Sequence, residues 1–95
     1  MYAQIVKFNL KPESSRELFL KFTEEMIEWL KEQVGFIAYE IYEGPDSWTD
    51  RIVWNTELQA KDGLHKFLAT DVAKQMLILV ESDFSSFFGE VVLSS

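Results

Sequence analysis

Residues 35–46 of this 95-residue chain read GFIAYEIYEGPD, and this stretch decides the fold. Gly35 is placed to end a preceding helix, because the left-handed position at a helix C-terminus favours glycine. The segment from Phe36 to Glu43 mixes isoleucine and tyrosine in the manner of a strand, and Gly44-Pro45-Asp46 is a strong turn signal. The chain therefore leaves a helix, forms a strand and turns back on itself.

Upstream of this stretch, the sequence predicts a strand followed by one long helix. The strand runs from Ala3 to Leu10 and carries β-branched and aromatic residues. Ser14 and Glu17 have the spacing of a capping box at a helix start. Six apolar side chains then recur at helical spacing and predict one buried stripe, formed by Leu18, Phe22, Met26, Trp29, Leu30 and Val34.

Downstream, the sequence predicts a third strand, a second helical segment and a last strand. The third strand spans Arg51 to Glu57 and pairs with the second as a hairpin whose loop carries Trp48. From about Ala60 to Val80 the apolar period is helical again, and Thr70-Asp71 predicts that this helix forms in two pieces. The last strand runs from Phe87 to Leu93 and contains Gly89 at a point typical of a bulge.

The order of elements is β-α-β-β-α-β, which predicts a single ferredoxin-like α+β domain over residues 1–95. Right-handed crossovers place both helices on one face of a four-stranded antiparallel sheet. The strands are substantially apolar on both faces, yet the helices can cover only one. We therefore expect a homodimer that forms through the open sheet face.

Charge and composition argue against several classes of partner and cofactor. The chain has 16 acidic and 9 basic residues, a net charge of -7, which argues against nucleic acid and against anionic membrane surfaces. With one histidine and no cysteine, a transition-metal site of the His/Cys type is not expected. We see neither a secretory signal nor an apolar stretch of membrane-spanning length, so we expect a cytoplasmic protein.

The chain resembles the antibiotic-biosynthesis-monooxygenase family along nearly its whole length. The resemblance is carried by Gly35 to Glu43, by Val53-Trp54 at the end of the hairpin, and by Leu68-Ala69-Thr70-Asp71 in the second helical segment. It implies a dimeric α+β barrel, in which two sheets face each other and each protomer keeps a pocket between its sheet and its helices. It also implies cofactor-independent oxygenation of a small aromatic or quinol-like substrate with molecular oxygen.

The resemblance implies that Asn9 on the first strand and Trp54 on the third would orient the substrate. His65, the only histidine, is the candidate general base from its side-chain chemistry, and the alternative is that a substrate oxyanion itself handles the proton. Similar proteins carry an asparagine four residues before this tryptophan, where the present chain has Asp50. A carboxylate there would repel a substrate oxyanion. His65 has an alternative interpretation as a surface residue of its helix.

The resemblance also bears on cofactors and on the pocket. In the haem-cleaving branch of the family, a tryptophan and a histidine ligand occupy the positions of Phe67 and Leu77, so we expect no haem here. Phe8, Tyr39, Tyr42 and Phe67 are candidate substrate-binding residues for a planar aromatic ligand. The same aromatic residues could instead form the core and the dimer interface. The alternative function is a non-catalytic dimeric module that binds a small ligand.

Overall fold

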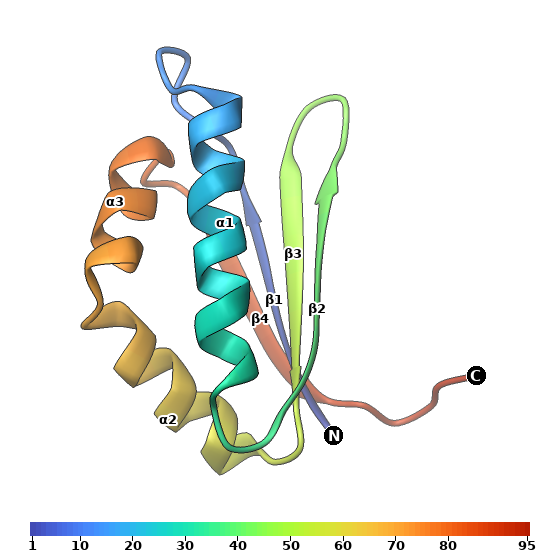
Figure 1. Ribbon diagram of the computed structural model, residues 1–95. Helices are drawn as coiled ribbons and strands as arrows, with labels where there is room; N and C mark the ends of the chain where they lie inside the picture. Colours follow the sequence, from blue (N-terminus) through green and yellow to red (C-terminus); the bar gives the residue numbers. More distant parts are fainter.

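The computed structural model describes residues 1–95, and its elements follow one another as β1 (Tyr2–Phe8), α1 (Arg16–Lys31), β2 (Phe36–Glu43), β3 (Trp48–Trp54), α2 (Glu57–Leu68), α3 (Asp71–Leu79) and β4 (Ser85–Glu90). The strands pair antiparallel in the order β2-β3-β1-β4. All three helices lie on one side of this sheet (Figure 1). The predicted ferredoxin-like α+β fold is confirmed. None of the helices combines the length and apolar composition that crossing a bilayer requires.

Helix α1 begins one residue later than the capping-box pattern indicates. Ser15 is the N-cap, and its hydroxyl accepts a hydrogen bond from the Leu18 amide at 3.1 Å. Ser14 instead donates its hydroxyl to the carbonyl of Leu79 at 2.9 Å, which ties the start of α1 to the end of α3. The predicted pairing of Ser14 with Glu17 is therefore wrong. The predicted stripe is correct at Met26 and Leu30, which are buried, and Trp29 packs against the core. Phe19 and Thr23 are buried as well, whereas Leu18 and Val34 are exposed.

The second helical segment consists of two helices, as predicted. Thr70 caps α3, because its hydroxyl accepts a hydrogen bond from the Ala73 amide at 3.2 Å. Helix α2 begins at Glu57, earlier than expected, because Thr56 caps it by accepting from the Gln59 amide at 3.1 Å. A cap at Thr56 forces the preceding strand to end before that residue.

Strand β3 accordingly runs from Trp48 to Trp54, three residues upstream of its predicted position. Trp48 belongs to the strand and to the core rather than to a loop. Its ring lies 5.5 Å from that of Phe19 and 6.3 Å from that of Phe8, centroid to centroid. Strand β4 also begins earlier than predicted, at Ser85. Short apolar runs identified both strands, but their boundaries depend on caps and pairing partners.

The core consists of two clusters between the sheet and the helices. One surrounds Trp54 and includes Tyr2, Leu30 and Ile52, whereas the other is formed by the three aromatic rings just described. Met76 of α3 packs against both clusters. The space between the two clusters is the position of the candidate site.

Candidate functional site

A cavity of about 260 Å³ lies between the sheet and the helices. Members of both core clusters line it, and 16 of its 20 lining residues are hydrophobic. Its volume is slightly smaller than the range of about 300–1,000 Å³ that is usual for small-molecule sites. A cavity of this size and character suits a small apolar compound.

Four large apolar side chains of the cavity wall are also partly open to solvent. These are Leu68 of α2, Leu77 of α3, Phe84 of the following loop and Phe88 of β4, which are 41–49% exposed. They lie where the helices face the edge strand β4. We identify this apolar rim as the mouth of the cavity.

Asp50 of β3 is the only ionisable residue in the cavity wall. Its Oδ2 accepts a hydrogen bond from the Tyr39 hydroxyl at 3.0 Å, whereas its Oδ1 is buried and has no partner. Burial raises the pKa of Asp50 to about 6, although the hydrogen bond from Tyr39 opposes this shift. Burial, followed by the charge of Asp50, raises the pKa of Tyr39, so its hydroxyl stays protonated and donating.

Two further buried polar atoms of the wall lack a hydrogen-bond partner, namely Gln4 Oε1 and Trp54 Nε1. In the sheet, Gln4 of β1 pairs with Ile52, which lies between Asp50 and Trp54 on the same face of β3. The three polar side chains therefore occupy neighbouring positions on one face. Buried polar groups in folded proteins are normally hydrogen-bonded. Three unpaired ones around a single cavity mark it as a candidate binding site.

Packing holds the indole of Trp54 in one place. Its side chain is 1% exposed, and the Phe36 ring lies 6.0 Å away, edge to face. A Cβ atom at Gly63 of α2 would overlap the Trp54 ring, so only glycine lets this helix approach. A glycine inside a helix is normally destabilising, and here its packing role accounts for it.

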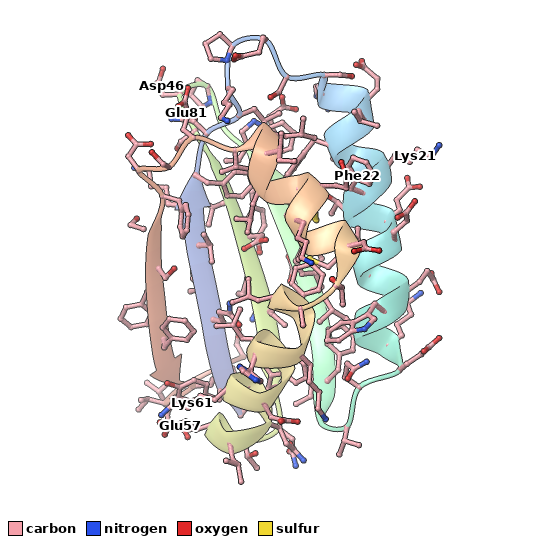
Figure 2. The ribbon with its side chains drawn as sticks, turned by 90° about the vertical axis from the view of Figure 1, so that its left-hand side faces the viewer. Lys21, Phe22, Asp46, Glu57, Lys61 and Glu81 are labelled. Atoms are coloured by element: carbon pink, nitrogen blue, oxygen red, sulfur yellow. The ribbon has the colours of Figure 1, made fainter.

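The structure separates Asn9 from Trp54. Asn9 is exposed just after β1, and its amide nitrogen, turned toward the hairpin, donates to the Asp46 carbonyl at 2.9 Å. Asp46 and Glu81 lie together at one end of the molecule (Figure 2). Trp54 pairs with Tyr2 at the opposite end of β1. At about 3.3 Å per residue, Asn9 and Trp54 are therefore about 20 Å apart along the sheet, and Asn9 is not part of the cavity wall.

His65 also lies outside the cavity. It is exposed in the last turn of α2 and is absent from the cavity wall. The outer surface of this helix carries ion pairs, including Lys61 with Glu57 at 2.8 Å (Figure 2) and Lys66 with Asp62 at 2.9 Å. Of the three candidate catalytic residues, the cavity therefore contains Trp54 alone.

The four candidate substrate-binding aromatic residues divide between the cavity and the rest of the fold. Phe8 and Phe67 line the cavity. Tyr39 does not line the cavity, but its hydroxyl donates to Asp50, which does. Tyr42 is on the open face of the sheet, where its hydroxyl donates to Glu40 at 2.8 Å, and it has no contact with the cavity.

The sequence contained a signal for the polar residues of the wall. Gln4 is the one polar residue among the alternate positions of β1 that face the helices, the others being Tyr2, Val6 and Phe8. A polar residue on an otherwise apolar strand face indicates a specific partner. The sequence also shows an aspartate at position 50, where similar proteins carry an asparagine. The burial of Asp50 Oδ1 and the hydrogen bond from Tyr39 are seen only in the structure.

Comparisons with known proteins support the fold. No profile of a known protein family matches the sequence, and no curated protein matches it either. Among solved structures, a variant of SnoaB, a cofactor-independent oxygenase from Streptomyces nogalater, superposes with a TM-score of 0.83 at 14% identity, over 98% of this chain and 94% of that one. A protein of Mycobacterium tuberculosis gives a TM-score of 0.80 at 14% identity, over 99% and 97% of the two chains.

A structure described as an antibiotic biosynthesis monooxygenase also matches, with a TM-score of 0.74 at 16% identity, over 98% of this chain and all of the other, 100%. These similarities show that the chain has the fold of antibiotic biosynthesis monooxygenases. The resemblance in fold that the sequence predicted is thereby confirmed.

Proposed function

We propose that this protein is a cofactor-independent monooxygenase that acts on a small aromatic, quinol-like compound bound in the cavity. The observation that carries the proposal is the apolar cavity whose wall holds three buried polar atoms without partners. The fold shared with SnoaB, described as a cofactor-independent oxygenase, supports the same class of reaction.

The atoms and electrons of the reaction balance without a cofactor when the substrate is an aromatic alcohol. One ring C–H para to the hydroxyl is replaced by a C=O bond whose oxygen comes from O₂, and the ring becomes a quinone. The second oxygen atom leaves as water, together with the ring hydrogen and the hydroxyl hydrogen. The substrate loses four electrons and O₂ gains four, so no external reductant is consumed.

The roles of the wall residues follow from their chemistry. Phe8 and Phe67 provide apolar surface against a flat ring. The indole N–H of Trp54 is buried without an acceptor, so it can donate to an oxygen of the substrate. A donor fixed in an apolar site stabilises negative charge that develops on that oxygen during the reaction.

Oxygen uptake with dihydroxynaphthalenes tests this function, and the tryptophans offer a matched pair of variants. Trp54→Phe removes the indole N–H from the cavity, whereas Trp48→Phe alters a buried tryptophan that does not line it. We expect uptake by the wild type, a loss of about tenfold or more in Trp54→Phe, and little change in Trp48→Phe. Binding without uptake would favour a non-catalytic ligand-binding module instead.

We further propose that the protein forms a homodimer through the open face of the sheet. Phe87 of β4 pairs with Ile5 on this face and is 64% exposed. Beyond β4 the chain extends away from the body of the molecule (Figure 1), with Val92 87% and Leu93 92% exposed. A second copy would remove this apolar surface from water. Light scattering after gel filtration should give twice the chain mass, and Phe87→Asp should give one chain mass.

A further inference from the structure

We propose that Asp50 is the residue that accepts the hydroxyl proton of the substrate, and that it restricts the cavity to ligands that enter as neutral hydrogen-bond donors. This inference rests on the proposed function, because it names the substrate class and the proton acceptor of the same site. It differs from the expectation that His65 is the base, since His65 lies outside the cavity.

The carboxylate of Asp50 has one oxygen without a hydrogen-bond partner. Tyr39 of β2 occupies Oδ2 at 3.0 Å, and nothing in the chain occupies Oδ1. The side chain forms part of the cavity wall. One acceptor oxygen is therefore left for a donor that comes from a ligand.

The cavity wall around Asp50 contains no positive charge. The Tyr39 hydroxyl of β2 donates to Asp50 from outside the wall. The wall itself receives the neutral Gln4 from β1, the neutral Ser86 from β4, and only apolar side chains from the helices. No lysine, arginine or histidine lines the cavity. Since no cation offsets the carboxylate, an anionic ligand would meet an unscreened like charge in an apolar environment, where charge repulsion is strong.

The proposed reaction of Asp50 is the transfer of one proton from the ligand. The hydroxyl O–H bond of the ligand breaks, its electron pair stays on the ring oxygen, and the proton forms a new O–H bond at Asp50 Oδ1. The carboxylate becomes a neutral acid as the ligand becomes an anion, so two negative charges never face each other. The raised pKa of Asp50, about 6, makes it a stronger base than an ordinary carboxylate while it remains mostly ionised at neutral pH.

This proton transfer gives a role to Asp50, the residue that departs from the family pattern. A carboxylate would repel a ligand that arrived already ionised, as the sequence indicated. A ligand that arrives neutral instead finds an acceptor, and the negative charge moves from the protein to the ligand. The class of ligand is therefore a neutral aromatic alcohol, not its anion.

Binding without oxygen tests the selectivity separately from turnover. Under nitrogen and near neutral pH, equilibrium dialysis would compare naphthol, fluoronaphthalene of similar shape but without a donor, and the anion naphthoate. We expect naphthol to bind about tenfold or more tightly than fluoronaphthalene, because hydrogen bonds to charged groups are strong. Naphthoate should bind most weakly.

Asp50→Asn is the decisive variant, with Asp46→Asn as its matched control. The first change removes the charge of a carboxylate whose Oδ1 is buried, whereas the second removes an exposed charge from the β2–β3 hairpin. We expect Asp50→Asn to lose the preference for naphthol and to bind naphthoate better than the wild type does. Asp46→Asn should keep the wild-type order. Unchanged selectivity in Asp50→Asn would overturn the proposal.

A pH profile tests the same group in the intact protein. Naphthol should bind more weakly as the pH falls through about 6, where Asp50 takes up a proton, and Asp50→Asn should lack this step. Tyr39→Phe removes the hydrogen bond that holds the pKa of Asp50 down, so its step should move to higher pH. Tyr39→Phe also serves if Asp50→Asn does not fold. A flat profile in the wild type would contradict the role of Asp50.

Oxygen uptake separates the two proposals. If the wild type consumes oxygen and Asp50→Asn keeps the full rate, the proton-accepting role is wrong and the proposed function stands. If the wild type discriminates between the ligands but consumes no oxygen, the proposed function alone is contradicted. Loss of uptake in Asp50→Asn, together with loss of selectivity, supports both.

Discussion

The two faces of the sheet treat polar groups in opposite ways. On the open face, Arg51 Nη2 donates to Glu40 Oε1 at 2.7 Å, so both side chains have partners although water is available to them. On the covered face, Asp50 Oδ1 and Trp54 Nε1 are buried and have none. Because Asp50 and Arg51 are adjacent in β3, one strand carries a polar side chain with a free buried atom and one that is paired. Unpaired buried groups reduce stability, so their position on the cavity side indicates function rather than folding.

Replacing Trp54 by alanine should have the largest effect on stability. The substitution leaves a hole between Phe36 and Gly63, and losing a buried tryptophan typically costs about 3–5 kcal/mol. Tyr42→Ala on the open face is the matched control, since that ring is 46% exposed. Urea unfolding followed by circular dichroism measures both. If the two variants lost similar stability, the open face would be packed as tightly as the covered one.

Asp50→Asn should stabilise the protein near neutral pH, in contrast to most core substitutions. The native carboxyl has a pKa raised from 3.8 to about 6, so the native state binds a proton more tightly than the unfolded state does. Stability from this group is therefore highest below pH 3.8 and falls as the pH rises to about 6. The difference amounts to about 3 kcal/mol at neutral pH.

The measurement is the difference in unfolding free energy between wild type and Asp50→Asn across this pH range. The comparison between the variants cancels the other acidic residues, which titrate in both. The gain should grow with pH and level off above about 6. A constant difference at every pH would mean that Asp50 is not buried as a carboxyl group.

The sequence predicted the architecture better than the site, for physical reasons. Helical spacing and strand composition depend on neighbouring residues, so the order of elements and the break at Thr70 could be predicted. Element ends depend on caps, and the choice of Ser15 over Ser14 needs the contact between Ser14 and Leu79. The site depends on which strand ends meet. Asn9 and Trp54 appeared as partners by resemblance, yet the antiparallel register places them at opposite ends.

Gln4→Leu should produce a smaller gain in stability. The buried Oε1 of Gln4 has no partner, and replacing an unsatisfied polar group by an apolar one of similar size removes a penalty of about 1–3 kcal/mol. Part of this gain is lost to imperfect packing, so about 1 kcal/mol is expected. Thr23→Val is the control, because Thr23 is equally buried but donates to the Phe19 carbonyl. If Thr23→Val gained stability and Gln4→Leu did not, the unpaired Gln4 would not be the destabilising group.

The smallest effect on a single chain is expected for Glu40→Gln on the open face. Hydrogen bonds from Arg51 and then Tyr42 hold the pKa of Glu40 below its usual value. Whatever stability this provides is present at neutral pH and disappears as the pH falls through the lowered pKa. Since the side chains of Arg51 and Glu40 are 35% and 50% exposed, water screens the pair and the unfolding midpoint should hardly move.

The same variant also distinguishes a single chain from a dimer. If a second copy covers the open face, the pair loses its water, and removing one charge leaves the other buried without a partner. Glu40→Gln would then weaken association, and its unfolding midpoint would fall further at low protein concentration than that of the wild type. Unfolding curves at two concentrations, with Asp46→Asn as an exposed control away from this pair, measure the difference. Curves for Glu40→Gln that match the wild type at both concentrations would show that this pair stays in water, so the copies would have to meet elsewhere on the face.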